Sequence, residues 1–202
     1  MQIALILFYP LLVHISVVMQ TPYLRAAALV VLALAILYRP LKRASAMAWV
    51  LLLAVAAGIV PGLFFDFTDF VLYLPPVVIP VMLLTVFGET LRPGHTPLVT
   101  AIGEKARGPL PAEMRRYTRA VTLMWCLVFA SMATVAAALP WLASQEIWSL
   151  FTNLLNYVFV GVLLFAEFLY RKYRFPDHDH PNLQQYIKIV ISANIGKRHG
   201  RD

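Results

Sequence analysis

Four ionisable residues follow one another near the end of the chain: Asp177, His178, Asp179 and His180. Alternate side chains of an extended segment share a face, so the two histidines could point the same way and bind a transition metal weakly. A complete metal site needs a third and a fourth ligand. We therefore favour a solvated turn, with a metal site and an acid-base site as the alternatives. We predict no bound metal and no cofactor.

Three polar residues interrupt otherwise apolar stretches: His14, Asn153 and Asn156. Polar groups at membrane depth are candidates for function. His14 and Asn153 each lie about six residues from the end of their predicted helix at the outer side of the membrane, which is roughly 9 Å at 1.5 Å per residue. The two side chains could therefore meet, with Asn156 one turn deeper. We favour an interhelical hydrogen bond over a polar pocket or a proton-handling site.

Glu167 is followed four residues later by Arg171, the favourable order for an ion pair on a helix. We interpret Glu167 as part of an ion pair or as a snorkelling anchor, with a catalytic acid as the alternative. The chain contains no nucleophile elbow, Walker loop, dinucleotide fingerprint or zinc-protease helix. We therefore predict no catalytic residue. If the protein is an enzyme, the candidates are His95, Glu104, Glu167, Asp177, His178 and His180.

Apolar helices must position these residues, because 60% of the 202 residues are hydrophobic and 13% are charged. The mean hydropathy of +0.73 excludes an ordinary soluble domain and predicts an integral membrane protein. A bilayer core about 30 Å thick needs roughly 20 helical residues, or fewer when flanking groups snorkel. We predict an all-α bundle of six transmembrane helices, at 2–19, 24–38, 46–65, 70–87, 120–142 and 147–170.

Three prolines, Pro75, Pro76 and Pro80, fall in the fourth of these segments. Each proline removes a backbone donor and disfavours a straight helix, so we predict that the fourth helix is kinked or broken. We favour a role in packing for this feature, with a cavity in the membrane as the alternative.

The basic residues predict the orientation of the bundle. All Lys and Arg residues except Arg25 fall in 39–43, 92–119 and 171–201. By the positive-inside rule, both termini and the loop 88–119 lie in the cytoplasm. We predict a single six-helix membrane domain over 1–176, which includes this loop, and a cytoplasmic basic tail over 177–202.

The loop 88–119 has signals for local structure. Turn residues at 93–97 lead into the stretch PLVTAIGEKARG at 97–108, which predicts a short amphipathic helix that Gly108 closes. The fifth helix is expected to begin before the membrane does. The positive charge favours membrane lipids as partners, with an acidic protein as the alternative and with no nucleic acid. The residues expected to make these contacts are Arg92, His95, Lys105, Arg107, Arg115, Arg116 and Arg119.

Two stretches of the chain, together with Tyr9 and Pro10, resemble a known family. They are FGETLRPGHTPLVTAIGEKARGPLPAEMRRYTRAVTLMW at 87–125 and IWSLFTNLLNYVFVGVLLFAEFLYRKYRFPDH at 147–178. The family consists of small, uncharacterised bacterial inner-membrane proteins whose genes lie beside fatty-acid-synthase-like genes of aryl-polyene or related pigment lipids. Some members are labelled ketosynthase, but this sequence has no Cys-His-His condensing site. The resemblance implies a pathway and an inner-membrane location, and no catalytic residues.

Within that pathway, an acyl carrier protein or a pathway enzyme becomes the candidate acidic partner. Our leading hypothesis is a non-enzymatic accessory protein that assembles, anchors or hands on a hydrophobic acyl or aryl-polyene-type lipid. An integral-membrane acyl or lipid transferase is the first alternative. A small transporter or flippase subunit, using the fourth helix and the level of His14 and Asn153, is the second.

Overall fold

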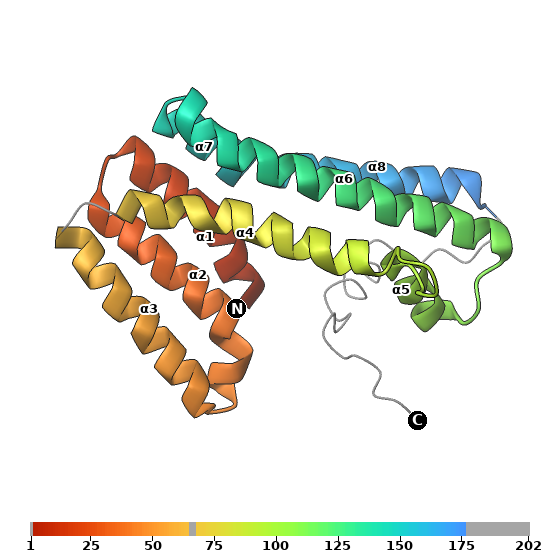
Figure 1. The fold of residues 1–202 in the computed structure, drawn as a ribbon, viewed down its shortest axis with the longest axis horizontal. Coiled ribbons are helices and arrows are strands. Elements are labelled where there is room, and N and C mark those ends of the chain that lie inside the picture. The colour runs from red at the N-terminus through yellow and green to blue at the C-terminus, as the bar shows by residue number, and fades with distance from the viewer. Residues whose placement is uncertain (1, 65–67, 177–202) are drawn as a thin grey trace. The chain divides into compact units, whose positions relative to one another are not determined.

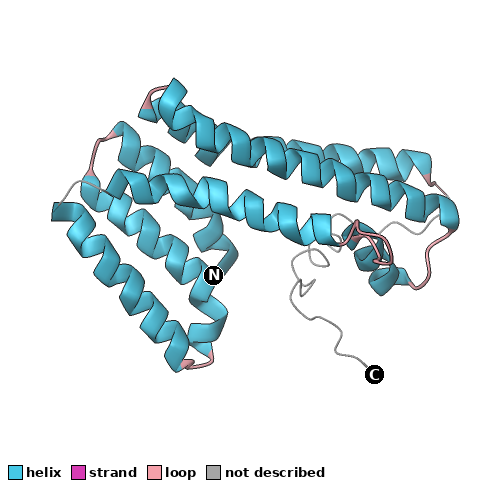
Figure 2. Cartoon of the chain, in the orientation of Figure 1, coloured by secondary structure: helices cyan, strands magenta, loops and turns pink. Residues whose placement is uncertain are grey.

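The computed structural model describes residues 2–64 and 68–176. Every regular element in this part of the chain is a helix, which confirms the all-α fold (Figure 1, Figure 2). The predicted tail 177–202 lies outside the described residues. The elements are α1 (Gln2–Val18), α2 (Pro22–Lys42), α3 (Ala46–Phe64), α4 (Thr68–Glu89), α5 (Leu98–Arg107), α6 (Ala112–Leu142), α7 (Gln145–Leu150), the π-helical turn η1 (Phe151–Leu155) and α8 (Asn156–Arg174).

Four helical stretches are long and apolar enough to cross a membrane: Pro22–Lys42, Val71–Glu89, Ala112–Leu142 and Gln145–Arg174. Two shorter apolar stretches are Ala4–Val18 and Ala46–Ile59. These lengths and compositions are those of a membrane protein. All six predicted segments fall on helices, while the number of crossings stays a prediction.

The chain divides into two compact units. The first comprises Met1–Ile79 and Met132–Phe159, and the second comprises Pro80–Ser131 and Val160–Asp202. The first unit therefore holds α1, α2, α3 and α7 with η1, whereas the second holds α5 and most of α8. Helices α4 and α6 contribute residues to both units.

Small side chains allow close packing in the first unit. Helix α1 packs against α2, and α2 packs against α3. Four alanines of α2 are buried, and such residues let membrane helices approach closely; they are Ala26, Ala28, Ala33 and Ala35. The buried core also joins Tyr9 of α1 to Leu72 of α4 and Trp148 of α7.

The predicted break in the fourth helix is wrong, because α4 is continuous over Thr68–Glu89. Pro75, Pro76 and Pro80 have no N–H group to donate to the preceding turn, and α4 is nevertheless helical through all three positions. All three prolines fall within less than two turns, so the loss of backbone N–H donors is confined to the middle of α4.

The segment between α4 and α6 is folded, as predicted. Gly94 and Gly108 have φ angles of 83° and 84°, in the left-handed region that glycine adopts without strain. Helix α5 lies between them, and α6 begins at Ala112. The predicted turn, the short helix and the early start of the fifth predicted helix are therefore confirmed.

The sixth predicted segment is a continuous helical run with one irregularity. At η1 the N–H of Asn156 bonds to the carbonyl of Phe151, five residues earlier. The hydroxyl of Thr152 donates to the carbonyl of Trp148 at 2.8 Å. Apolar spacing does not predict this π-helical turn, because the run 147–170 is apolar on most sides.

Candidate functional site

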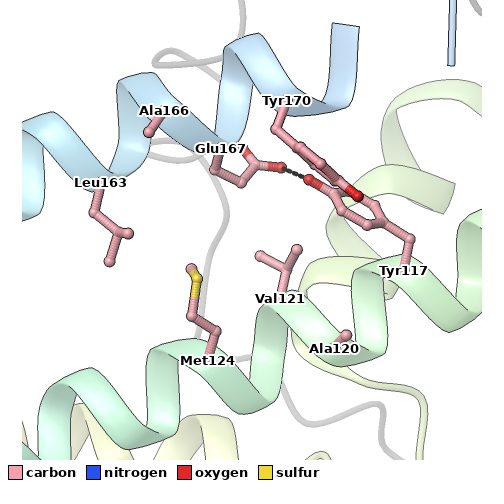
Figure 3. A pocket seen from close by; sticks show the side chains of 8 residues that line it. All are labelled: Tyr117, Ala120, Val121, Met124, Leu163, Ala166, Glu167 and Tyr170. Carbon is pink, nitrogen blue, oxygen red and sulfur yellow. Dashed lines mark hydrogen bonds between the residues drawn. The ribbon is translucent and has the colours of Figure 1, made fainter. Parts of the chain in front are cut away.

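An apolar pocket lies between α6 and α8 within the second unit (Figure 3). Its volume is about 460 Å³, within the range of about 300–1,000 Å³ that small-molecule sites occupy. The pocket is lined by Tyr117, Ala120, Val121, Met124, Leu163, Ala166, Glu167 and Tyr170. Among these residues Glu167 alone carries a charge.

The helical repeat places the lining residues on two facing stripes. The four residues of α6 have the spacing i, i+3, i+4, i+7, and so do the four of α8. The helices run antiparallel, because Glu113 pairs with Arg174 whereas Tyr117 pairs with Glu167. Ala120 and Ala166 are short, so they leave space between the stripes (Figure 3).

Tyr117 and Glu167 form the polar end of the pocket. The hydroxyl of Tyr117 donates to Oε1 of Glu167 at 3.1 Å (Figure 3), and Nε of Arg171 lies 3.6 Å from the same oxygen. Glu167 is only 7% exposed, and a buried carboxylate is stable when it is paired and hydrogen-bonded. The predicted Glu167–Arg171 ion pair is confirmed. The Tyr117 contact joins two helices, so local spacing cannot predict it.

Aromatic rings close the pocket beside this polar end. The rings of Tyr117 and Tyr170 are stacked, with centroids 5.8 Å apart and planes inclined by 29°. The ring of Phe175 lies 5.4 Å from that of Tyr117. Farther along, Arg174 donates to the carboxylate of Glu113. These contacts tie the start of α6 to the end of α8.

Threonine hydroxyl groups attach α5 to α6. The Oγ1 atoms of Thr100 and Thr118 lie 2.7 Å apart, and both residues are buried. The N–H of Val99 donates to Oγ1 of Thr122 at 3.3 Å, which satisfies one of the N-terminal donors of α5. One side of α5 therefore packs against protein, and its exposed side carries the charge.

The basic residues of 88–119 whose side chains the structure describes lie at the surface. Arg115 is 3.4 Å from Oε1 of Glu104, and Arg119 donates to the carbonyl of Leu91 at 3.2 Å. Both contacts connect α6 to the segment that precedes it. The structure does not describe the side chain of Arg107. The other exposed cations of the segment are Arg92, Lys105 and Arg116.

The polar residues predicted inside the membrane belong to the first unit. Nδ1 of His14 lies 3.2 Å from Oγ of Ser149, and Nδ2 of Asn153 donates to Oγ1 of Thr152 at 3.0 Å. His14 thus contacts the helical run that carries Asn153, one turn before it. Asn156 begins α8 and is half-buried.

The structure separates the candidate catalytic residues. Glu167 lines the pocket, whereas His95 is exposed, with Nδ1 3.4 Å from the carbonyl of Pro93. Glu104 pairs with Arg115. Within residues 2–64 and 68–176, no group of three or more His, Cys, Asp and Glu side chains could hold a metal ion. The candidates outside the described residues are Asp177, His178 and His180.

The sequence reasoning misses most of the pocket: Tyr117, Tyr170, Ala120 and Ala166 are not among its candidates. The repeated spacing i, i+3, i+4, i+7 is a signal for them. This signal is weak, because a membrane helix is apolar on all sides and the pattern does not show which stripe faces another helix.

Comparisons with protein-family models, with curated proteins and with solved structures find no match to this chain. The family resemblance of 87–125 and 147–178 therefore stays a prediction. The function has to be inferred from the site itself, because a helical fold hosts many activities.

Proposed function

We propose that this protein is a non-enzymatic accessory protein of the bacterial inner membrane, which holds a hydrophobic lipid chain and helps to assemble, anchor or hand on its carrier. The pocket between α6 and α8 supports this proposal. It is lined mainly by apolar side chains, on helical stretches long enough to cross a membrane. In a bilayer, hydrocarbon fills such a space, because an empty one would forfeit contacts along its lining.

The identity of the lipid comes from the family resemblance. An acyl or aryl-polyene-type lipid has the long apolar chain that this pocket accommodates. Its synthesis on a carrier protein in the cytoplasm would require a membrane component that receives the finished chain. We therefore propose hand-off from a soluble carrier to the membrane as the role of the protein.

The basic surface supports docking of an acyl carrier protein or a pathway enzyme. Helix α5 is held on α6 by Thr100 and Thr118, so the surrounding cations are presented in fixed positions. Complementary charge steers encounter and fixes register between partners. The same basic surface also attracts anionic lipid headgroups, through Arg115, Arg116 and Arg119.

The proposal includes six crossings, with both termini in the cytoplasm. Helices α1 and α3 supply the two additional crossings, with 17 and 19 residues. At 1.5 Å per residue they extend about 26 and 29 Å, close to the thickness of a bilayer core. The basic residues between and after the helices support this orientation.

Retention of lipid during purification tests the role of the pocket. Ala120→Phe places a ring in the pocket, and Ala137→Phe makes the same change at an exposed position of α6. We expect Ala120→Phe to lower the amount of bound lipid, measured by mass spectrometry, about tenfold, because overpacking costs about 1–3 kcal/mol. Ala137→Phe should retain it. Equal retention by both variants would overturn the proposal.

A membrane acyl or lipid transferase is the second candidate, because Glu167 lies at the pocket and could accept a proton from an attacking hydroxyl. Glu167→Gln keeps the size of the side chain and removes the base. Loss of product lipid in cells, with lipid retention and protein level unchanged, would support catalysis. Normal product would exclude a catalytic role for Glu167.

A further inference from the structure

We infer that the pocket between α6 and α8 takes an amphiphile whose head group donates hydrogen bonds, with the head at Glu167 and the chain end at Met124 and Leu163. This inference rests on the proposed function for the presence of a bound chain. It adds the direction of that chain and the chemical class of its head group.

The direction follows from the position of the polar side chains. Tyr117, Glu167 and Tyr170 lie at one end of the pocket (Figure 3), and the other lining residues are apolar. Because α6 and α8 run antiparallel, Met124 and Leu163 border the opposite end. The seven residues from Tyr117 to Met124 correspond to about 10 Å along the helix. An amphiphile that enters this space matches its polar head to the polar end.

The chemistry of the head group follows from Glu167. Its carboxylate is paired with Arg171 and accepts from Tyr117, and each carboxylate oxygen accepts more than one hydrogen bond, so an ammonium or a hydroxyl group finds an acceptor there whereas an anion without a donor does not. Its cationic partner Arg171 is not one of the eight lining residues. The head group therefore meets a carboxylate and two phenol rings.

The aromatic rings favour the same class of head group. Tyr117 and Tyr170 stack beside the carboxylate, and the faces of aromatic rings attract cations. Tyr170 is 55% exposed, so its ring is accessible at the mouth of the pocket. An ammonium head group is attracted by both the carboxylate and the rings. A hydroxyl head group gains only the hydrogen bond to Glu167. A carboxylate head group gains neither this hydrogen bond nor the attraction of the rings.

The space for the chain lies between the short side chains. Ala120 and Ala166 leave the middle of the pocket open, and the larger Met124 and Leu163 border its far end. Hydrocarbon in this position contacts apolar atoms on both helices. The far end therefore receives the terminal carbons of the chain.

Photo-crosslinking in lipid nanodiscs tests both parts of the inference. The probes are octylamine, 1-octanol and octanoate, each with a diazirine at the chain end, at equal concentration in the membrane. We expect octylamine to label the protein at least about tenfold more than octanoate, at Met124 or Leu163. Equal or stronger labelling by octanoate, or labelling of Tyr117 and Tyr170 by the chain end, would overturn the inference.

Three variants separate this inference from the proposed function. Glu167→Gln should bring the labelling ratio of amine to carboxylate probe close to one, whereas Tyr117→Phe, which keeps the charge, should leave that ratio high. Ala120→Phe should lower labelling by all three probes about tenfold. If no probe labels the wild-type pocket, the proposed function fails together with the inference. If all three label it equally, the inference alone fails.

Discussion

The two units of the molecule bury polar side chains in different ways. In the first unit, Ser149 and Asn153 are 0% and 2% exposed, and hydrogen bonds link them to His14 and Thr152. In the second unit, Glu167 is similarly buried but borders a pocket. Space beside a buried polar group therefore separates the site that we propose as a binding site from the filled interior of the first unit.

The size of the neighbouring side chains explains this difference. In the first unit, Trp148 is fully buried and its ring meets that of Tyr73 edge-on at 4.7 Å. In the second unit, the alanines of the pocket lining leave room between α6 and α8. An aromatic pair fills part of the core of the first unit, whereas two alanines leave space between α6 and α8 beside the buried Glu167 of the second unit.

The largest expected effect concerns packing. Trp148→Ala should lower the free energy of unfolding by about 4 kcal/mol, because it leaves a cavity in a filled core. Leu163→Ala should cost about 1 kcal/mol, since one side of Leu163 already faces the pocket. Detergent-induced unfolding followed by circular dichroism measures both. If Leu163→Ala costs as much as Trp148→Ala, the second unit is as tightly packed as the first and the comparison fails.

The next effect concerns the charge at the pocket. Glu167→Ala should lower the free energy of unfolding by about 3 kcal/mol, because it leaves the guanidinium of Arg171 without the carboxylate that it pairs with. The side chain of Arg171 is only 13% exposed. The double variant Glu167→Ala, Arg171→Met should recover most of the loss, measured by the same unfolding titration. A double variant less stable than the single one would show that Arg171 stabilises the fold even without Glu167 and would contradict this expectation.

The sequence predicts some features of the second unit and not others. Apolar runs predict the helices, and the spacing of Glu167 and Arg171 predicts their ion pair, because both signals are local. Tyr117 and Glu167 are 50 residues apart, and nothing local indicates which stripe of α6 faces α8. The sequence therefore does not predict the pocket, since the pocket depends on how α6 and α8 pack against each other.

Local signals also lead to one error. The three prolines predict a break in α4, but the helix is continuous, as membrane helices tolerate proline when the freed carbonyl groups find other partners. By contrast, Gly94 and Gly108 correctly predict the limits of the turn and of α5, since left-handed backbone at a non-glycine residue is costly. The sequence thus predicts where the chain turns better than whether a helix tolerates proline.

A smaller effect concerns the attachment of α5 in the second unit. Thr118→Val removes the partner of the buried Thr100 hydroxyl, which should cost about 1 kcal/mol. Local detachment of α5 should then speed cleavage by trypsin at Lys105 about fivefold, because cleavage follows the population of the open form. Thr85→Val is the control, since the Thr85 hydroxyl is exposed and donates to the carbonyl of Met82 in its own helix. Equal cleavage of both variants would show that the threonine contact does not hold α5.

The smallest effect tests the first unit directly. Ser149→Ala and His14→Phe, alone and combined, form a double-mutant cycle, and we expect a coupling energy of about 0.6 kcal/mol, typical of a hydrogen bond between membrane helices. Product lipid in cells should not change, because Ser149 is fully buried and is enclosed by packed side chains. A coupling energy above about 2 kcal/mol, beyond the range measured for such bonds, would indicate a stronger role for the pair. Loss of product lipid in Ser149→Ala at normal protein level would place a functional site in the first unit. Space beside a buried polar group would then no longer distinguish the second unit from the first.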